Sequence, residues 1–184
     1  MVLKFLLVLA VALAQLENWE YKKGRCHPIK KLDSLDTAFF TNKFYQILRS
    51  KGFPLLFGQC VTSTRTFVPE NTVLVRIQQI FMGMRLSGNA TVTIDLENKL
   101  GEYKISSPLA TLEGNYVITD SSTYFMTYIC ESEEENRRDL LEIYSTDVNF
   151  NATFLLPIVS SLGFNSTEYD MINHSPEACA TNPI

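Results

Sequence analysis

Histidine is scarce in this chain, which has only His27 and His174 in 184 residues. Both lie in segments predicted to be peripheral, so neither is expected to act as a catalytic base, a metal ligand or an axial haem ligand. The sequence also lacks a nucleophile-elbow pattern, a Gly-rich phosphate loop and a C-x-x-C pair. These absences predict that the protein is not an enzyme, has no cofactor and binds no metal.

Basic charge is also limited, with 16 Lys and Arg against 20 Asp and Glu and a formal net charge of −4. Binding to nucleic-acid phosphates needs concentrated Lys and Arg. The basic clusters at residues 22–25 and 30–31 are short and are interpreted as solvated surface. We therefore expect no nucleic-acid partner.

No apolar run reaches the about 20 residues that a membrane-spanning helix needs. The run at residues 5–14 follows Lys4 and ends in Ala12-Leu13-Ala14, which offers small residues at the two positions that a signal peptidase reads. This pattern is typical of a secretory signal peptide covering residues 1–14. The remaining 170 residues, 15–184, are enough for one domain. We expect that domain to be secreted and extracellular.

The cysteines and sequons agree with an extracellular protein. Cys26, Cys60, Cys130 and Cys179 form an even set that export would oxidise to disulfides, and four cysteines allow three connectivities. Candidate N-glycosylation sites occur at Asn89, Asn151, Asn165 and Asn173, the last being followed by Pro176 and therefore a poorer acceptor.

Between residues 42 and 148 the chain reads as short β-type runs separated by turn residues. The breakers include Gly52, Gly83, Gly88 and Gly114. Eight runs at spacings near a dozen residues indicate an all-β sandwich or an up-and-down barrel. The runs are 43–49, 58–67, 73–81, 89–96, 102–106, 115–119, 123–130 and 140–146.

A helix is predicted over about residues 151–163, where apolar residues recur at helical spacing and Gly163 is a plausible terminator. Pro157 is unfavourable inside a helix, so the helix either starts near it or bends there. The tail 164–184 is polar, and Cys179 should attach it to the body of the protein.

Alternation within the runs predicts which side chains face inward. An eight-stranded barrel has an interior that is either packed or wide enough for one small ligand, and the pattern does not separate these two interpretations. The residues predicted to point inward on this basis are Val73, Val75, Ile77, Ala90, Val92, Ile94, Tyr103, Ile105, Tyr116 and Ile118.

Three ordered motifs resemble a known family. Gly24-Arg-Cys26-His-Pro28 precedes the segment 42–47, Tyr116-Val-Ile-Thr119-Asp120 lies ten residues before Cys130, and the segment 141–146 is followed by the helix and Cys179. Together they resemble the lipocalins, specifically the invertebrate group similar to apolipoprotein D and the bilin-binding proteins. The resemblance covers essentially the whole mature chain and implies an eight-stranded antiparallel up-and-down barrel with one helix packed outside.

Several positions depart from the family pattern. Asn42 and Phe44 replace a glycine and a tryptophan, Ser121 replaces a tyrosine, and Thr146 stands where an arginine usually follows the last strand. The usual stacking of arginine on tryptophan at the closed end is therefore not expected, and Phe44 is expected to close the barrel by packing alone.

The resemblance also implies a disulfide pairing and a ligand site. It pairs Cys26 with Cys130 and Cys60 with Cys179. The family register places Phe125, Thr127 and Ile129 inward, joined by Tyr116 and Ile118, and Ile143 from the last strand. Gln79 shares parity with Val75 and Ile77 and is a candidate for meeting a ligand's polar end near the mouth, although a solvated strand end is an equal interpretation.

The resulting hypothesis is a secreted, glycosylated carrier of a small hydrophobic ligand such as a fatty acid, assumed to be monomeric. The alternative is a protein that acts through its outer surface as an inhibitor, signalling partner or nutritive store. Capture of a polar amine would need inward carboxylates, and alternation places Glu102 and Glu142 outward. The apolar segment 51–57 could form a lid, a peripheral membrane contact, a dimer patch or an ordered loop.

Overall fold

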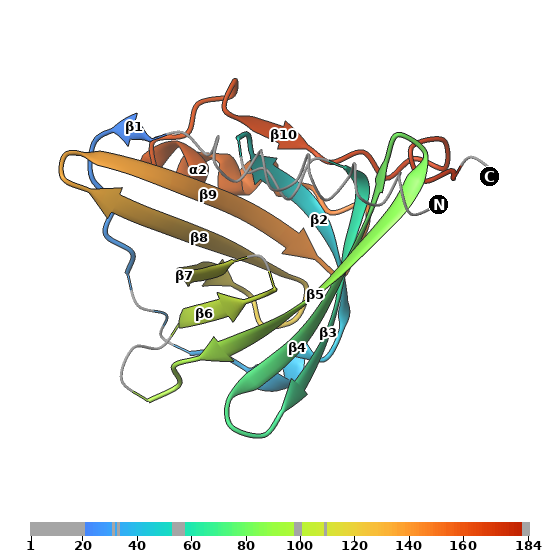
Figure 1. Ribbon diagram of the computed structural model, residues 1–184, viewed down its shortest axis with the longest axis horizontal. Coiled ribbons are helices and arrows are strands. Elements are labelled where there is room, and N and C mark those ends of the chain that lie inside the picture. Colours follow the sequence, from blue (N-terminus) through green and yellow to red (C-terminus); the bar gives the residue numbers. More distant parts are fainter. Residues whose placement is uncertain are drawn as a thin grey trace.

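The computed structural model describes residues 21–30, 32, 34–52, 58–97, 101–108 and 110–181. The predicted leader at residues 1–14 and residues 53–57 of the apolar segment lie outside the described residues. Within the described part, eight strands form the barrel (Figure 1). They are β2 (Lys43–Ser50), β3 (Gln59–Val68), β4 (Thr72–Phe81), β5 (Met84–Ile94), β6 (Glu102–Ser106), β7 (Thr111–Thr119), β8 (Tyr124–Glu133) and β9 (Asn136–Ser145).

Each barrel strand pairs antiparallel with its neighbour in sequence, and β9 pairs back onto β2 to close the sheet. The closing register runs from Tyr45 opposite Ser145 to Arg49 opposite Glu142, with an irregularity between Gln46 and Leu48. Two short strands extend the sheet, because β1 (Lys22–Lys23) pairs with β9 and β10 (Tyr169–Met171) pairs with β2. The predicted closed antiparallel barrel is therefore confirmed.

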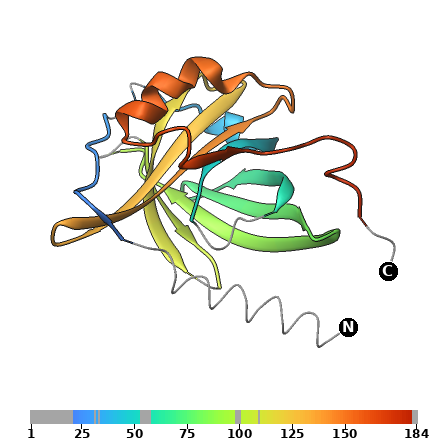
Figure 2. The same ribbon diagram turned by 90° about the horizontal axis from the view of Figure 1, so that it is seen from above.

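The predicted helix is present as η2 (Ala152–Leu155) followed by α2 (Leu156–Ser161). Pro157 lies in the first turn of α2, where its missing N–H is not needed, so the helix starts near the proline and does not bend around it. Figure 2 shows α2 on the outside of the barrel. Its Val159 packs into an outer apolar cluster with β2, β8 and β9 side chains that include Leu48, Met126 and Leu141.

A second apolar cluster fills part of the barrel interior. The 3-10 helix η1 (Thr37–Phe40) contributes two buried phenylalanines, Phe39 and Phe40, to this inner cluster. Asp36 caps η1 by accepting the N–H of Ala38 at 2.9 Å. The remaining buried members are Phe44, Val73, Val75, Val92, Ile94, Tyr103, Tyr116, Phe125, Ile129, Leu140 and Tyr144.

Two disulfides attach the chain ends to the barrel wall, and both pairings match the prediction. Cys26 bonds to Cys130 on β8, across 104 residues of sequence. Cys60 on β3 bonds to Cys179 in the tail, across 119 residues. Cys130 packs with the outer cluster, so that disulfide lies outside the barrel interior.

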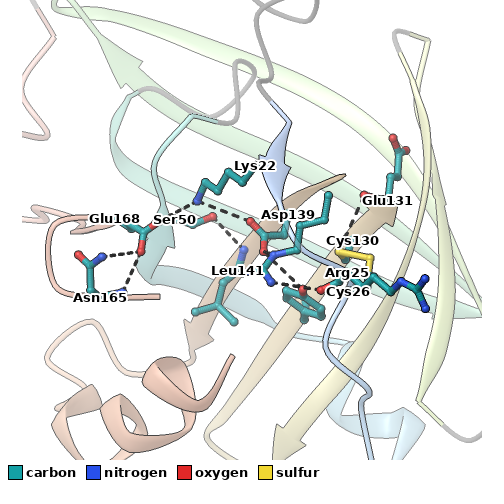
Figure 3. A network of polar contacts seen from close by, with 12 residues as sticks. Lys22, Arg25, Cys26, Ser50, Cys130, Glu131, Asp139, Leu141, Asn165 and Glu168 are labelled. Carbon is teal, nitrogen blue, oxygen red and sulfur yellow. Dashed lines mark hydrogen bonds and ion pairs between the residues drawn. A yellow bond between two sulfur atoms is a disulfide. The ribbon is translucent and has the colours of Figure 1, made fainter. Parts of the chain in front are cut away.

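Ion pairs reinforce the N-terminal attachment (Figure 3). Lys22 on β1 donates to a Glu168 carboxylate oxygen at 2.9 Å and lies 3.7 Å from Asp139 on β9. The fully buried Asp139 carboxylate also accepts from Arg137 Nε at 2.8 Å. The pKa of Glu168 is lowered, first by the Asn165 N–H and then by Lys22.

The turn between β7 and β8 is organised by Asp120, the aspartate of the Thr119-Asp120 motif. Its Oδ1 accepts the N–H groups of Ser122, Thr123 and Tyr124 at 2.7–3.0 Å. Burial alone would raise the pKa of Asp120, but these N–H donors outweigh that effect and lower it. The carboxylate therefore holds the turn by local hydrogen bonds.

Two glycines predicted to break strands lie inside them. Gly88 is in β5 opposite Ile77, and Gly114 is in β7 between Tyr103 and Ile129. Consequently β5 and β7 start earlier than expected, at Met84 and Thr111. Neither glycine has a positive φ, so both occupy ordinary strand positions. The space available for a side chain, rather than the backbone conformation, therefore determines which residue fits at each position.

Candidate functional site

Most of the predicted lining residues lie in the barrel interior. Val75, Val92, Ile94, Tyr103, Tyr116, Phe125 and Ile129 are buried members of the inner cluster, and Ile77, Ala90 and Ile105 pack against it while partly buried. Thr127 is buried and lies directly opposite both Tyr116 and Glu142, so it faces the same interior.

Ile118 and Ile143 do not face inward, contrary to prediction. Ile118 packs against the outer cluster because the β7–β8 register shifts between Tyr116 and Ile118, which moves Ile118 to the opposite face. Ile143 is also in the outer cluster, because Tyr144 and Glu142 on either side of it point inward.

The prediction that Glu142 points outward is therefore wrong as well. Glu142 is buried, and its Oε1 accepts from Gln46 Nε2 at 2.7 Å and from the Tyr144 hydroxyl at 2.9 Å. Gln46 Nε2 also lies 3.0 Å from the Tyr144 hydroxyl oxygen, so the three side chains form a closed triangle. This triangle joins β2 to β9 inside the barrel.

Burial determines the protonation behaviour of this triangle. Burial raises the pKa of Glu142, and the Tyr144 hydroxyl and the positive charges of Arg65 and Arg49 offset part of that rise. Burial and then the nearby Glu142 raise the pKa of Tyr144 well above its usual value. Both shifts favour the neutral forms of the two groups.

Arg65 occupies the centre of the aromatic part of the interior. Its guanidinium carbon lies 4.4 Å from the Phe125 ring centroid, 5.3 Å from Tyr144 and 5.7 Å from Phe44. It donates to Ser63 Oγ at 3.1 Å and to the Tyr116 hydroxyl at 3.3 Å. Phe44 thus does not close the barrel by packing alone, because an arginine from β3 stacks on the rings.

The sequence did contain a signal for Arg65. The β3–β4 hairpin turns at Pro69-Glu70-Asn71, and Val68 pairs with Thr72. Counting back from this turn places Arg65 opposite the inward Val75. Gln46 and Arg49 carried no comparable signal, because β2 does not alternate between apolar and polar residues and contains an irregularity between Gln46 and Leu48.

The two strand glycines show which part of the interior is filled. A Cβ added to Gly114 would lie 2.7 Å from Ile129 Cγ1 and 2.8 Å from the Tyr103 ring, so this wall is packed. A Cβ added to Gly88 would meet no heavy atom within 4 Å. Gly88 pairs with the inward-facing Ile77 and is itself exposed, so it lies on the inner face where the barrel is open to solvent.

Apolar side chains around that space keep accessible surface. Ile77, Ile105 and Leu112 face inward by register, yet each is only partly buried. Gln79 continues the same inward parity and is 8% exposed, with its Oε1 accepting the Gly58 N–H at 3.0 Å. Gln79 is thus not a solvated strand end.

Other predicted sites lie on the surface. Asn89, Asn151, Asn165 and Asn173 are all exposed. The Asn165 Nδ2, the atom that a glycan would occupy, donates to Glu168 at 2.8 Å. Asn89 also borders an open groove of about 610 Å³ whose walls include Thr64, Leu74, Arg76 and Pro108.

Cys60, His174 and Cys179 place ligand-type atoms within 4.8 Å of one another. Both sulfurs are consumed by the disulfide, and His174 Nε2 lies 2.8 Å from the Gln46 carbonyl oxygen. The cluster therefore offers no thiolate for a metal ion. Among the described residues, no helix has the length and apolar character that crossing a membrane would require.

Comparison with known proteins agrees with this architecture. No protein-family model matches the chain. A bilin-binding protein from Pieris brassicae is 24% identical over 140 residues, which cover 73% of this chain and 72% of that protein.

Solved structures give a closer match in fold than in sequence. Insecticyanin from the tobacco hornworm Manduca sexta superposes with a TM-score of 0.73 at 17% identity, covering 88% of this chain and 92% of that one. Lobster apocrustacyanin A1 gives a TM-score of 0.72 at 14% identity, covering 85% and 92%.

Proposed function

We propose that this chain, which is similar in sequence to a bilin-binding protein and in fold to insecticyanin, is a lipocalin that carries a small hydrophobic ligand, a fatty acid or a similar lipid, inside its barrel. The relative from Pieris brassicae is named for binding a bilin. A siderocalin that superposes with a TM-score of 0.60 at 12% identity is described as functioning through dual ligand specificities. Such a role involves no chemical transformation, in agreement with the prediction that the chain is not an enzyme.

The observation that carries the proposal is the open space at Gly88. It is bordered by Ile77 and Ala90, with Ile105 and Leu112 contributing further partly accessible apolar surface to the same interior. Transfer of a hydrocarbon chain from water onto such surface stabilises binding by roughly 25 cal/mol per Å² buried. An aromatic layer beneath it, built on Phe44 and Phe125, would limit how deeply a ligand enters.

Secretion and glycosylation form part of the same proposal. The leader at residues 1–14 would direct export, and an oxidising compartment suits the two disulfides. All four sequon asparagines are exposed, which glycosylation requires. We expect Asn89 and Asn151 to be modified more completely than Asn165, whose amide is held by Glu168.

The test fills the open space with a side chain. Gly88 does not have a positive φ, so Gly88→Phe places a ring inside the barrel without strain in the backbone. Binding of the fluorescent fatty acid cis-parinaric acid should fall at least about tenfold, because the apolar surface near Gly88 is then covered. Ser87→Phe is the matched control, since Ser87 is exposed and lies on the opposite face of the same strand.

The result that contradicts the carrier proposal is equally concrete. Wild-type protein that takes up no cis-parinaric acid, and that releases no lipid when the natively purified protein is extracted and analysed by mass spectrometry, would exclude it. Function through the outer surface would then be favoured, with the groove beside Asn89 as the first surface to mutate.

A further inference from the structure

Three buried polar atoms inside the barrel have unused hydrogen-bonding capacity among the described residues. They are Arg49 Nη1, Gln46 Oε1 and Thr127 Oγ1, and the last lies close enough to the Tyr103 hydroxyl to offset part of the rise that burial causes in the pKa of Tyr103. The three side chains are 5%, 0% and 3% exposed. A buried polar atom without a partner costs free energy comparable to a lost hydrogen bond, so a bound ligand or an ordered water is expected to supply the missing partners at Arg49 and Gln46.

The strand register brings these atoms together. Thr127 on β8 lies opposite Glu142 on β9, and Glu142 lies opposite Arg49 on β2. Side chains directly opposite on adjacent strands share a face, so Thr127, Glu142 and Arg49 form one row across the inner wall. Gln46 is joined to this row by its hydrogen bond to Glu142.

Two arginines and two carboxyl groups carry the charge of this wall, namely Arg49 and Arg65 with Glu142 and Asp170. Arg49 and Arg65 are both buried in the barrel, and Glu142 is the carboxyl that lies between them and is already held by Gln46 and Tyr144. No ion pair joins Arg49 to a carboxylate within 4 Å in the part of the chain that the structure describes. Asp170, the residue opposite Arg49 on β10, pairs with Lys51 at 3.5 Å, and its charge also offsets part of the lowering of the pKa of Arg49 by burial.

We propose that Arg49, assisted by the Thr127 hydroxyl, binds the ionised carboxylate of the carried ligand. Arginine presents donors in a planar fork that matches a carboxylate, and such charge-assisted hydrogen bonds are about twice as strong as neutral ones. Gln46 Oε1 is an acceptor, and it accepts from a water or a hydroxyl that accompanies the head group. The ligand class is thus a monocarboxylate with an apolar body, which excludes bulky amines.

This inference rests on the carrier function proposed above. It also bears on the capture of a polar amine, which would need inward carboxylates. Amine capture was disfavoured because Glu142 was predicted to face outward. Glu142 faces inward, but amines remain disfavoured because Gln46 and Tyr144 already occupy that carboxyl and the charges of Arg65 and Arg49 act on it.

The test compares an acid with its uncharged ester. Affinities of cis-parinaric acid and its methyl ester are measured by fluorescence for wild type, Arg49→Met and Thr127→Val. Wild type should prefer the acid by about tenfold, and Arg49→Met should lose about tenfold in acid affinity while its ester affinity stays within about twofold. Thr127→Val, which is isosteric, should weaken acid binding by several-fold.

Arg76→Met is the matched control, because Arg76 is exposed on the outer face of β4 and should leave both affinities unchanged. Retained ester binding shows that Arg49→Met still folds. Equal losses for acid and ester, or no loss at all in Arg49→Met, overturn the inference. Wild type that binds the ester but not the acid overturns it while leaving the carrier function standing, whereas wild type that binds neither overturns both.

Discussion

At the scale of single residues, the aromatic interior depends on the ring contacts and hydrogen bonds of Arg65. A guanidinium is flat and more weakly hydrated than an ammonium, so it can lie against several rings and still donate in its own plane. Here it contacts the faces of Phe125 and Tyr144 and donates to Ser63 and Tyr116. The aromatic side chains around Arg65 thereby accommodate its charge. Without Arg65, the hydroxyl groups of Ser63 and Tyr116 would lose this donor.

We expect Arg65→Lys to destabilise the protein although it keeps the charge. A lysine cannot stack flat on Phe125 and cannot reach Ser63 and Tyr116 in one plane, so the loss should be about 1–2 kcal/mol. Urea denaturation followed by circular dichroism measures this loss. Arg76→Lys, at the exposed outer face of β4, should change the free energy of unfolding by less than about 0.5 kcal/mol. Equal midpoints for the two variants would show that the stacking contributes nothing.

The sequence predicted residue orientation well where strands alternate regularly and poorly where they do not. Val75, Ile77, Val92 and Ile94 lie in the unbroken β4–β5 ladder and were placed correctly. Ile118 was placed wrongly because a bulge shifts register by one residue, and a one-residue shift exchanges the two faces. Nothing in the composition of β7 marks that bulge.

At the scale of elements, the N-terminal segment is attached to the barrel by charge as well as by sulfur. Lys22 lies between Glu168 and Asp139, so β1 is tied both to β9 and to the loop that precedes β10 (Figure 3). The Glu168 carboxylate also accepts the Asn165 N–H at 3.0 Å. One carboxylate thus connects two segments that are 146 residues apart.

This arrangement predicts a pH-dependent contribution to stability. The folded-state pKa of Glu168 lies below its unfolded value, so its contribution is present above the unfolded pKa of about 4.3 and is lost as pH falls through the folded pKa. Glu168→Gln should lower the free energy of unfolding at pH 7 by up to about 1 kcal/mol, since the side chain is 27% exposed.

The measurement is the urea midpoint of wild type and Glu168→Gln from pH 7 to pH 3. The difference between them should be constant down to about pH 5 and then shrink, because the wild-type carboxylate becomes protonated. Glu113→Gln serves as the control, since the Glu113 side chain is 81% exposed. A difference that grows on acidification would contradict the assigned direction of the pKa shift.

Element boundaries were less predictable than element types. Glycine was treated as a strand breaker, yet Gly88 and Gly114 lie within strands. The reasons differ and are both tertiary: Gly114 is needed because Tyr103 and Ile129 occupy its side-chain space, whereas Gly88 opens the interior. Neither reason is visible in a local sequence window, because the neighbouring groups come from other strands.

At the scale of the whole molecule, the barrel has a filled part and an open part. Phe39, Phe40 and the aromatic layer on Arg65 fill one part, and the open space at Gly88 lies in the other. The eight strands, the helix and both disulfide pairs could be predicted from the sequence, because the ordered motifs constrain the entire chain. The polar row at Arg49 could not, since it depends on closure of β2 against β9.

Both disulfides clamp chain ends to the wall, so they should contribute to global stability without shaping the interior. On the chain-entropy model, cross-links closing loops of 104 and 119 residues are each worth about 5 kcal/mol, and measured values usually fall at 2–5 kcal/mol. We therefore expect the double variants Cys26→Ser/Cys130→Ser and Cys60→Ser/Cys179→Ser to lose similar amounts, because the two loops differ little in length.

Urea denaturation of the two double variants measures these losses, and binding of cis-parinaric acid methyl ester under native conditions reports on the interior. Stability should fall in both variants while ester affinity stays close to that of wild type, because Cys130 packs with the outer cluster and neither disulfide contributes to the inner one. A Cys60→Ser/Cys179→Ser variant that keeps its stability but loses ester binding would contradict this expectation. That disulfide would then hold the interior open. The wall near Cys60 and Gly58, rather than the apolar surface at Gly88, would then govern ligand entry.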